Sequence, residues 1–186
     1  MNNDADQLST VKDTIVKGME AVLSLGEEAG FIIEKDIQTL PELEEQMWEV
    51  VKRMLVDLIS FYQSNGLGIS LLSMSYGTWC AYAGIGAAYL WKEDPEQIRE
   101  INIYEQVTGP CGIDAVDEYV LDMLGIQLQS DEMRELNDHL MNGYSAVSNI
   151  VMENTSGDQN LDMYTAGAVM YRYGVEIGLS RQDEEI

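Results

Sequence analysis

Apolar residues recur along this chain with the spacing of α-helices. Between residues 41 and 64 they stand mostly three or four positions apart and so share one helix face: Leu43, Met47, Val50, Val51, Met54, Leu58 and Phe61. Thr39 to Glu42 form a capping box with Pro41 at an early helical position, and Asn65-Gly66 ends the segment. No run of alternating residues is long enough to indicate a β-strand. The pattern predicts an all-α fold.

The same spacing and the same kinds of end signal place the other helices. The three prolines, Pro41, Pro95 and Pro110, all fall at predicted helix boundaries. The predicted helices cover about residues 9–36, 41–64, 69–91, 95–107, 113–124, 130–154 and 160–179. We expect one domain over residues 1–186, a bundle of about six helices around the segment 69–91, with a frayed polar tail at 181–186.

The two halves of the chain are alike in plan. In each half a cap containing glutamates leads to a long helix, a turn, and a helix rich in glycine and tyrosine. At an offset of 90 residues, Gly77 meets Gly167 and Gly84 meets Gly174. Overall identity at this offset is low. The sequence therefore leaves open whether the halves, about 1–90 and 91–180, are two related three-helix units or a coincidence.

The segment 64–91, SNGLGISLLSMSYGTWCAYAGIGAAYLW, contains no charged residue. It is long enough to cross a bilayer, but serines, tyrosines and glycines dilute its aliphatic residues. No cluster of Lys and Arg flanks it, since Lys92 stands alone before Glu93 and Asp94. We therefore expect a buried central helix over 69–91, with the helix 160–179 as its neighbour, and no membrane partner.

Small residues form a seam along both of these helices. They lie at Gly77, Ala81, Gly84, Ala88, Gly167, Gly174 and Gly178. Each glycine inside a helix costs about 1 kcal/mol relative to alanine, so another interaction must offset it. One interpretation is close backbone approach between the two packed helices. The other is a ligand pocket with polar walls, lined by Tyr76, Trp79, Tyr82 and Tyr173.

Acidic residues dominate the charge of the chain. It has 33 acidic and 10 basic residues, a formal net charge of -23 and a sequence pI of about 4.1. This sign excludes direct binding of nucleic acid and disfavours an anionic membrane surface. Basic proteins, cationic ligands and metal ions gain from such a field. The alternative is that the charge serves solubility alone.

The acidic residues concentrate in the segment 93–138. Asp114, Glu118 and Asp122 stand four residues apart with Asp117 beside them, and positions 100–133 contain no Lys or Arg. Like charges at this spacing repel by a few tenths of a kcal/mol per pair, which a basic partner would relieve. The predicted docking surface also includes Glu100, Asp131, Glu132 and Glu135. The alternative is an ordinary solvated face.

Two cysteines, Cys80 and Cys111, are too few for a disulfide framework. The first ten residues, MNNDADQLST, have neither a basic region nor an apolar one, so no secretory signal is visible. We therefore expect a cytoplasmic protein with free thiols. Cys111 lies in a Gly-Pro-Cys-Gly turn, where a thiolate would be favoured if a helix begins there, but no histidine can be placed beside it.

Catalytic and metal-binding patterns are weak. The single histidine, His139, lacks the Glu-x-x-His spacing of a di-iron site and is expected on a helix surface. The acids Glu42, Glu45, Glu49 and Asp57 can mimic one metal-binding helix of an all-α nucleotide pyrophosphohydrolase, or be the solvated face of an acidic helix. We assign no catalytic residue, no metal ligand and no cofactor.

These observations predict a non-enzymatic interaction protein that binds a basic protein through residues 93–138. An inhibitor, an immunity protein and a nucleic-acid mimic all fit this description. Two alternatives stay open. One is a small-molecule-binding or divalent-metal-dependent all-α enzyme, such as a nucleotide pyrophosphohydrolase. The other is a structural subunit of a homo-oligomer, closed through an exposed apolar face. The eleven methionines are compatible with core filling or with an adaptable interface.

Overall fold

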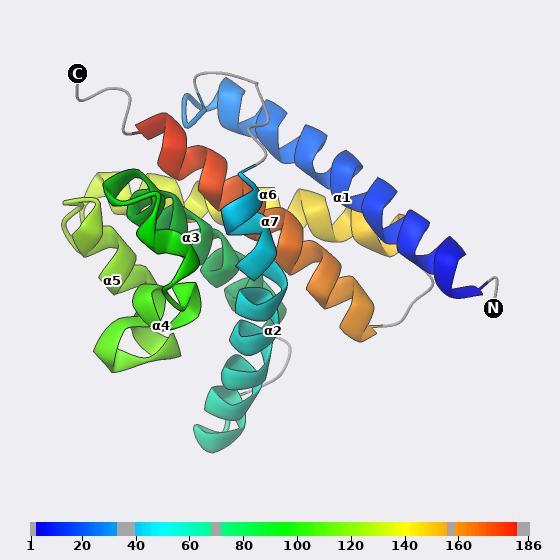
Figure 1. The fold of residues 1–186 in the computed structure, drawn as a ribbon, viewed down its shortest axis with the longest axis horizontal. Helices are drawn as coiled ribbons and strands as arrows, with labels where there is room; N and C mark the ends of the chain where they lie inside the picture. Colours follow the sequence, from blue (N-terminus) through cyan, green and yellow to red (C-terminus); the bar gives the residue numbers. More distant parts are fainter. Residues whose placement is uncertain (1–2, 33–39, 68–71, 156–158, 182–186) are drawn as a thin grey trace.

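The computed structural model describes residues 3–32, 40–67, 72–155 and 159–181, and in them the chain is a single all-α bundle (Figure 1). The predicted fold class is therefore confirmed. The α-helices are α1 (Asn3–Glu28), α2 (Pro41–Ser64), α3 (Leu72–Glu93), α4 (Ile103–Thr108), α5 (Val116–Met123), α6 (Asp131–Asn154) and α7 (Gln159–Arg181). Three short 3₁₀-helices, η2 (Gln97–Arg99), η3 (Gly109–Cys111) and η4 (Ile113–Ala115), lie between α3 and α5. In the described ranges there is no strand.

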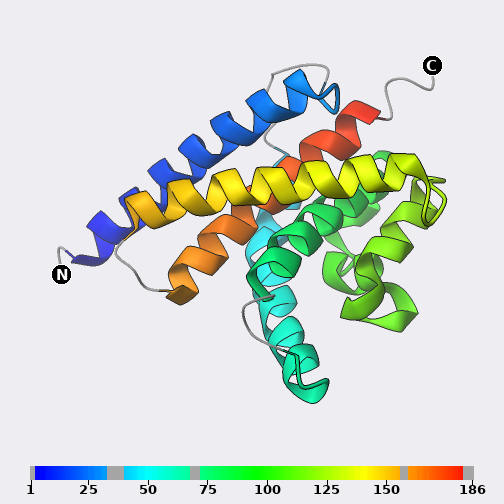
Figure 2. The same cartoon turned by 180° about the vertical axis from the view of Figure 1, so that it is seen from behind.

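Helices α3 and α7 form the centre of the bundle, as the sequence predicts. α7 packs against α1, α2, α3 and α6, and α3 packs against α2, α5, α6 and α7. Figures 1 and 2 show α7 passing through the middle, with α2 crossing in front of it in Figure 1 and α6 crossing in front of it in Figure 2. Almost every residue is buried between Tyr76 and Ala88 and between Thr165 and Leu179. No helix of the described part is long and apolar enough to span a membrane.

Glycine allows the backbones of α3 and α7 to touch. A Cβ atom added at Gly84 would lie 1.9 Å from the carbonyl oxygen of Tyr171, and one added at Gly174 would lie 1.9 Å from that of Ala81. No side chain fits at such distances without moving the helices apart. At these positions the close approach of two backbones offsets the helix-propensity cost of glycine.

The contacts at the centre repeat with the 90-residue offset seen in the sequence. Gly84 and Gly174 are 90 residues apart, as are the residues they touch, Tyr171 and Ala81. α2 and α6 are both 24 residues long and begin 90 residues apart. α2 packs on α3 as α6 packs on α7. A pseudo-twofold relation between the two halves would produce these paired contacts, and that relation and the ancestry of the halves stay predictions.

The first helix is shorter at its carboxyl end than the prediction of 9–36. α1 ends at Glu28, and Gly30 then takes a left-handed φ of 77°. The N–H of Phe31 donates to the carbonyl of Gly26 at 2.8 Å, which closes the helix end. The turn buries Ile32, so an apolar residue continues the helical spacing although the helix has ended. Residues 33–39 lie outside the described residues, as do residues 182–186 of the predicted tail.

The predicted helix 95–107 is interrupted, and a side chain from α2 is the reason. Gln46 donates from Nε2 to the carbonyl of Ile98 at 3.0 Å and accepts from the N–H of Ile103 at 3.1 Å. The side chain of Asn102 caps α4 by accepting from the N–H of Glu105. Between η2 and α4, these side-chain hydrogen bonds replace the backbone hydrogen bonds of a helix. The prediction of one continuous helix over 95–107 was therefore wrong.

Candidate functional site

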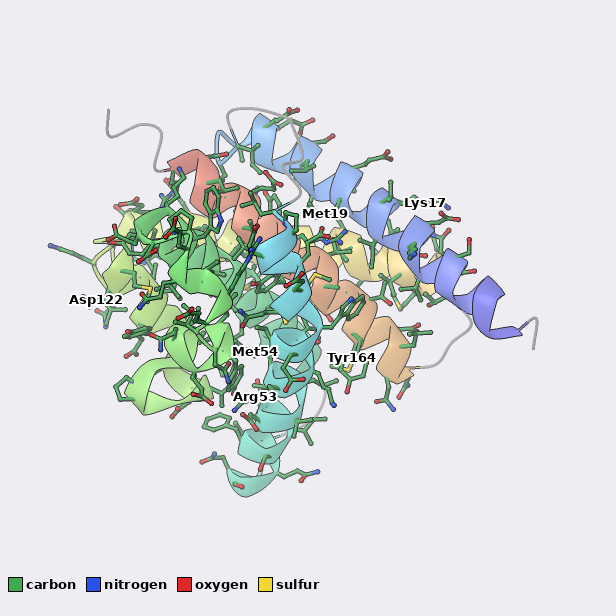
Figure 3. All side chains as sticks on the ribbon, viewed as in Figure 1. Lys17, Met19, Arg53, Met54, Asp122 and Tyr164 are labelled. Carbon is green, nitrogen blue, oxygen red and sulfur yellow. The ribbon has the colours of Figure 1, made fainter. Side chains whose placement is uncertain are left out.

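Exposed acids gather at one end of the molecule, on η4, α5 and the start of α6. Asp114, Glu118, Asp122 and Glu135 are all exposed. Figure 2 shows α5 and the start of α6 at the same end of the bundle, and Asp122 lies at its outer edge in Figure 3. Among the described residues, none of these four carboxylates has an ion pair or a hydrogen bond from another side chain. We call these four residues, with Leu128, the acidic end.

Leu128 is an exposed apolar residue within this acidic surface. Its exposed fraction is 54%, and it lies in the connection between Asp122 of α5 and the first turn of α6. Gln129 follows with a positive φ of 65°, which turns the chain sharply at this point. The acidic end therefore combines an exposed apolar side chain with four exposed carboxylates on the neighbouring η4, α5 and α6.

Two of the predicted docking residues are ion-paired. Arg134 Nη1 lies 2.5 Å from Asp131 Oδ1 on the same helix. Arg181 Nη2, at the end of α7, lies 2.7 Å from Glu132 Oε1. Both pairs face solvent, where such contacts contribute at most about 1 kcal/mol. Their negative charge is nevertheless less available to a partner than that of the four unpaired acids.

The remaining two predicted docking residues lie elsewhere. Asp117 is half-buried, and burial raises the pKa of its carboxyl group. Its charge adds to the effect of burial in raising the pKa of the Tyr82 hydroxyl on α3. Glu100 is exposed beyond η2, a segment that packs against α2 and α3 rather than α5. The structure therefore brings together part of the predicted surface.

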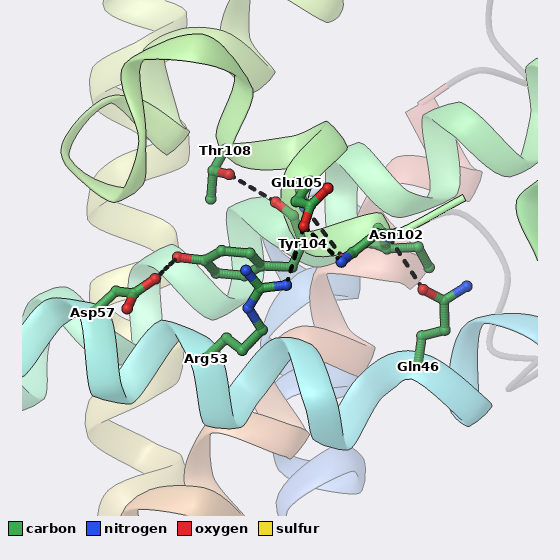
Figure 4. A network of polar contacts seen from close by, with 8 residues as sticks. Gln46, Arg53, Asp57, Asn102, Tyr104, Glu105 and Thr108 are labelled. Atoms are coloured by element: carbon green, nitrogen blue, oxygen red, sulfur yellow. Dashed lines mark hydrogen bonds and ion pairs between the residues drawn. The ribbon is translucent and has the colours of Figure 1, made fainter. Parts of the chain in front are cut away.

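A polar network fixes α4 on α2 and so positions the acidic end (Figure 4). The hydroxyl of Tyr104 donates to the carboxylate of Asp57, and the guanidinium carbon of Arg53 lies 4.3 Å from the centre of the Tyr104 ring. Arg53 also reaches Glu105 at 3.5 Å. Burial, with Asp57 beside it, raises the pKa of the Tyr104 hydroxyl. α4 in turn packs against α5.

The acids suggested for a metal-binding helix are divided between different partners. Asp57 accepts from Tyr104, and Glu42 pairs with Arg99 at 2.5 Å. Glu45 and Glu49 are exposed on α2. In the part of the chain that the structure describes, no group of three or more His, Cys, Asp or Glu side chains is placed to hold a metal ion.

His139 is half-buried, which corrects the expected position on a helix surface. Its ring stacks on Phe31 with 4.4 Å between ring centroids, and its Nε2 shares a hydrogen bond with the Tyr173 hydroxyl. Burial lowers the pKa of the imidazole. The turn after α1, which the sequence did not predict, brings Phe31 over the ring. Cys80 is fully buried, whereas the side chain of Cys111 lies outside the described part.

The four aromatic residues predicted for a ligand pocket are spread through the interior. Tyr76 donates to the Val51 carbonyl at 3.1 Å, and Tyr82 donates to Asn137 Oδ1 at 2.9 Å. Tyr173 is hydrogen-bonded to His139 of α6. Trp79 lines an open groove of about 450 Å³ between α3 and α6, and the other three are absent from its described lining.

A separate cavity of about 200 Å³ lies between α1, α2 and α7. Figure 3 labels Met19, which α1 contributes to the lining. The apolar part of the lining is Val16, Met19, Leu40, Leu43, Met47 and Val175, with the Tyr171 ring. Three charged side chains complete it, Glu44 from α2 and Arg172 and Glu176 from α7. We call it the α1–α2–α7 cavity.

Glu176 is the unusual residue of this cavity. Its exposed fraction is only 6%, and its carboxyl group has no hydrogen bond or ion pair with any described residue. Arg172, one turn earlier, pairs instead with Glu44 at 2.8 Å. Burial raises the pKa of the Glu176 carboxyl group to about 7. Sequence reasoning missed Glu176, although a lone acid in the apolar run 173–179 was a usable signal.

Comparison with known proteins assigns no family to this chain. No protein-family model matches it, and neither does any curated protein or solved structure. Function must therefore be inferred from two features, the acidic end and the α1–α2–α7 cavity.

Proposed function

We propose that this chain is a non-enzymatic binding protein that docks a basic protein through the acidic end. One observation carries the proposal. Leu128 is exposed among carboxylates that lack ion pairs with described residues. Protein interfaces commonly place an apolar anchor inside a charged rim, and the rim steers the partner while the anchor excludes water.

The charge of the whole chain supports the same kind of partner. A formal net charge of -23 attracts basic proteins over a distance set by ionic strength and repels nucleic acids. Repulsion among Asp114, Glu118 and Asp122 is relieved when cationic side chains bind between them. Inhibitors, immunity proteins and nucleic-acid mimics of basic enzymes share this physical basis. We place the protein in the cytoplasm, where the buried thiol of Cys80 stays reduced.

The experiment compares two variants of equal net charge. The first reverses the four acids of the acidic end to lysine: Asp114, Glu118, Asp122 and Glu135. The control reverses four exposed acids on other parts of α1, α2 and α6: Asp13, Glu20, Glu49 and Glu153. Asp117 is left intact because it is half-buried, so its reversal would disturb folding.

Each chain is immobilised and used to capture proteins from a lysate of its source cells at low and at high salt. We expect the unmodified chain and the control to retain the same basic protein at low salt and release it at high salt. The variant of the acidic end should retain none. Equal retention by both variants would show that net charge alone, and not the acidic end, binds the partner.

A further inference from the structure

We propose that the α1–α2–α7 cavity binds a small primary amine, whose ammonium group pairs with Glu176 and whose apolar part packs against the walls. The site is distinct from the acidic end, which lies on η4, α5 and α6. The inference therefore does not depend on the proposed partner. A mostly apolar lining with a few polar groups is the usual composition of a small-molecule site.

The volume sets the size of the ligand. An apolar cavity of about 150 Å³ in another protein holds one benzene molecule. At about 200 Å³, this cavity accommodates a molecule slightly larger, with about six to eight carbon atoms. The cavity is not closed off from solvent, because Val16 of α1, which lines it, has an exposed fraction of 55%. The ligand can therefore enter without separating the helices.

The charged groups of the lining decide the charge of the ligand. The charged groups that share the cavity with Glu176 are Glu44 of α2 and Arg172 of α7, and the Tyr171 hydroxyl, whose pKa burial raises, stays neutral. In the described lining, α1 contributes Val16 and Met19. Arg172 and Glu44 neutralise each other at 2.8 Å. Ionised Glu176 then leaves one uncompensated negative charge, which one ammonium group balances. A carboxylate ligand would add a second negative charge, and a neutral ligand would leave Glu176 unpaired.

Protonation of Glu176 makes the binding depend on pH. Its pKa is raised to about 7 by burial, and an ammonium group beside it lowers that pKa again. Amine binding therefore releases a proton near neutral pH. An alkylamine stays protonated up to a pH of about 10, as lysine does. Affinity should rise about thirtyfold between pH 5.5 and pH 8, because the competing proton is lost over that range.

The test is calorimetric titration of the full chain at pH 8 with three ligands of one size: hexylamine, hexanol and hexanoate. We expect hexylamine to bind at least tenfold more tightly than the other two. Glu176→Gln, which keeps the shape of the side chain, should lose this preference. The matched control is Glu45→Gln, an exposed acid on α2 outside the lining, and it should bind hexylamine as the unmodified chain does.

A second measurement separates ionic pairing from a change in folding. Titrations with hexylamine at pH 7, in buffers of different ionisation enthalpy, report the protons released on binding. We expect about half a proton per amine for the unmodified chain and none for Glu176→Gln, since a group with a pKa of about 7 is half-protonated there. Absence of proton release, or equal binding of hexanoate, would overturn the proposal.

A further arm identifies the source of the amine. N-acetyl-lysine methylamide carries the same ammonium group and a butyl stem but has a bulky backbone. If it binds as tightly as hexylamine, the natural ligand is a lysine side chain of another protein. If hexylamine alone binds, the ligand is a free small amine. Both results support pairing with Glu176, and failure of both amines to bind contradicts it.

Discussion

Glu176→Gln provides a direct test of how strongly the fold disfavours a buried charge. Burial raises the pKa of this carboxyl group from its ordinary value of 4.5 to about 7. A carboxyl group whose pKa is raised in the folded state binds its proton more tightly in the folded chain than in the unfolded chain. It therefore contributes stability to the fold, and this contribution is complete below pH 4.5. That stability is lost as the pH rises through 7, because the folded chain must then hold the charge.

The size of the effect follows from the shift. About 2.5 pH units correspond to roughly 3 kcal/mol. Solvent enters the α1–α2–α7 cavity and stabilises part of the charge, so we expect a loss of about 2 kcal/mol between pH 4.5 and pH 8. Glutamine cannot ionise, and the variant should lack this component of the pH dependence.

Urea unfolding at several pH values measures the effect. The free energy of unfolding of Glu176→Gln, minus that of the unmodified chain, should rise by about 2 kcal/mol from pH 4.5 to pH 8. All other titrating groups are common to both chains and cancel in this difference. Glu45→Gln removes an exposed carboxylate and should show a difference close to zero at both pH values. A constant difference for Glu176→Gln would refute the account of its burial.

Three further substitutions test the packing of the fold. Gly84→Ala should lower the free energy of unfolding by about 3 kcal/mol in urea, because its Cβ would lie 1.9 Å from the Tyr171 carbonyl oxygen. Gly143→Ala is the matched case, since its Cβ would meet no atom closer than 3.6 Å, and it should stabilise the chain by about 0.5–1 kcal/mol. Equal effects at the two glycines would contradict the close approach of α3 and α7. Tyr104→Phe should cost about 1–2 kcal/mol in the same assay, because it removes the hydrogen bond to Asp57, and an unchanged midpoint would show that this bond does not hold α4.

Local patterns predicted the helices well where the signals lie within the helix itself. The predicted bounds of α2, 41–64, agree with the structure because Pro41 and Asn65-Gly66 mark its two ends. The break before α4 was missed because its cause, Gln46, lies 52 residues before Ile98 in the sequence. The end of α1 was missed because Ile32 continues the apolar spacing beyond the turn.

The candidate sites were predictable only in part, because local patterns indicate which residues are exposed but not which distant residues they contact. Exposure of Asp114, Glu118 and Asp122 follows from their positions opposite the buried residues of α5. The pair between Glu132 and Arg181 joins residues 49 positions apart, so no local pattern indicates it. The surroundings of Glu176 come from α1 and α2, and only the packed structure brings them together.

The most direct test of the proposed function is the rate at which the captured basic partner associates with the chain as salt is varied. Electrostatic steering raises association rates by about 10- to 1,000-fold, and the gain falls steeply with ionic strength. We predict a steep decrease with salt for the unmodified chain and a much flatter one after Asp114, Glu118, Asp122 and Glu135 are reversed. An association rate that depends neither on salt nor on these four residues would contradict docking through the acidic end.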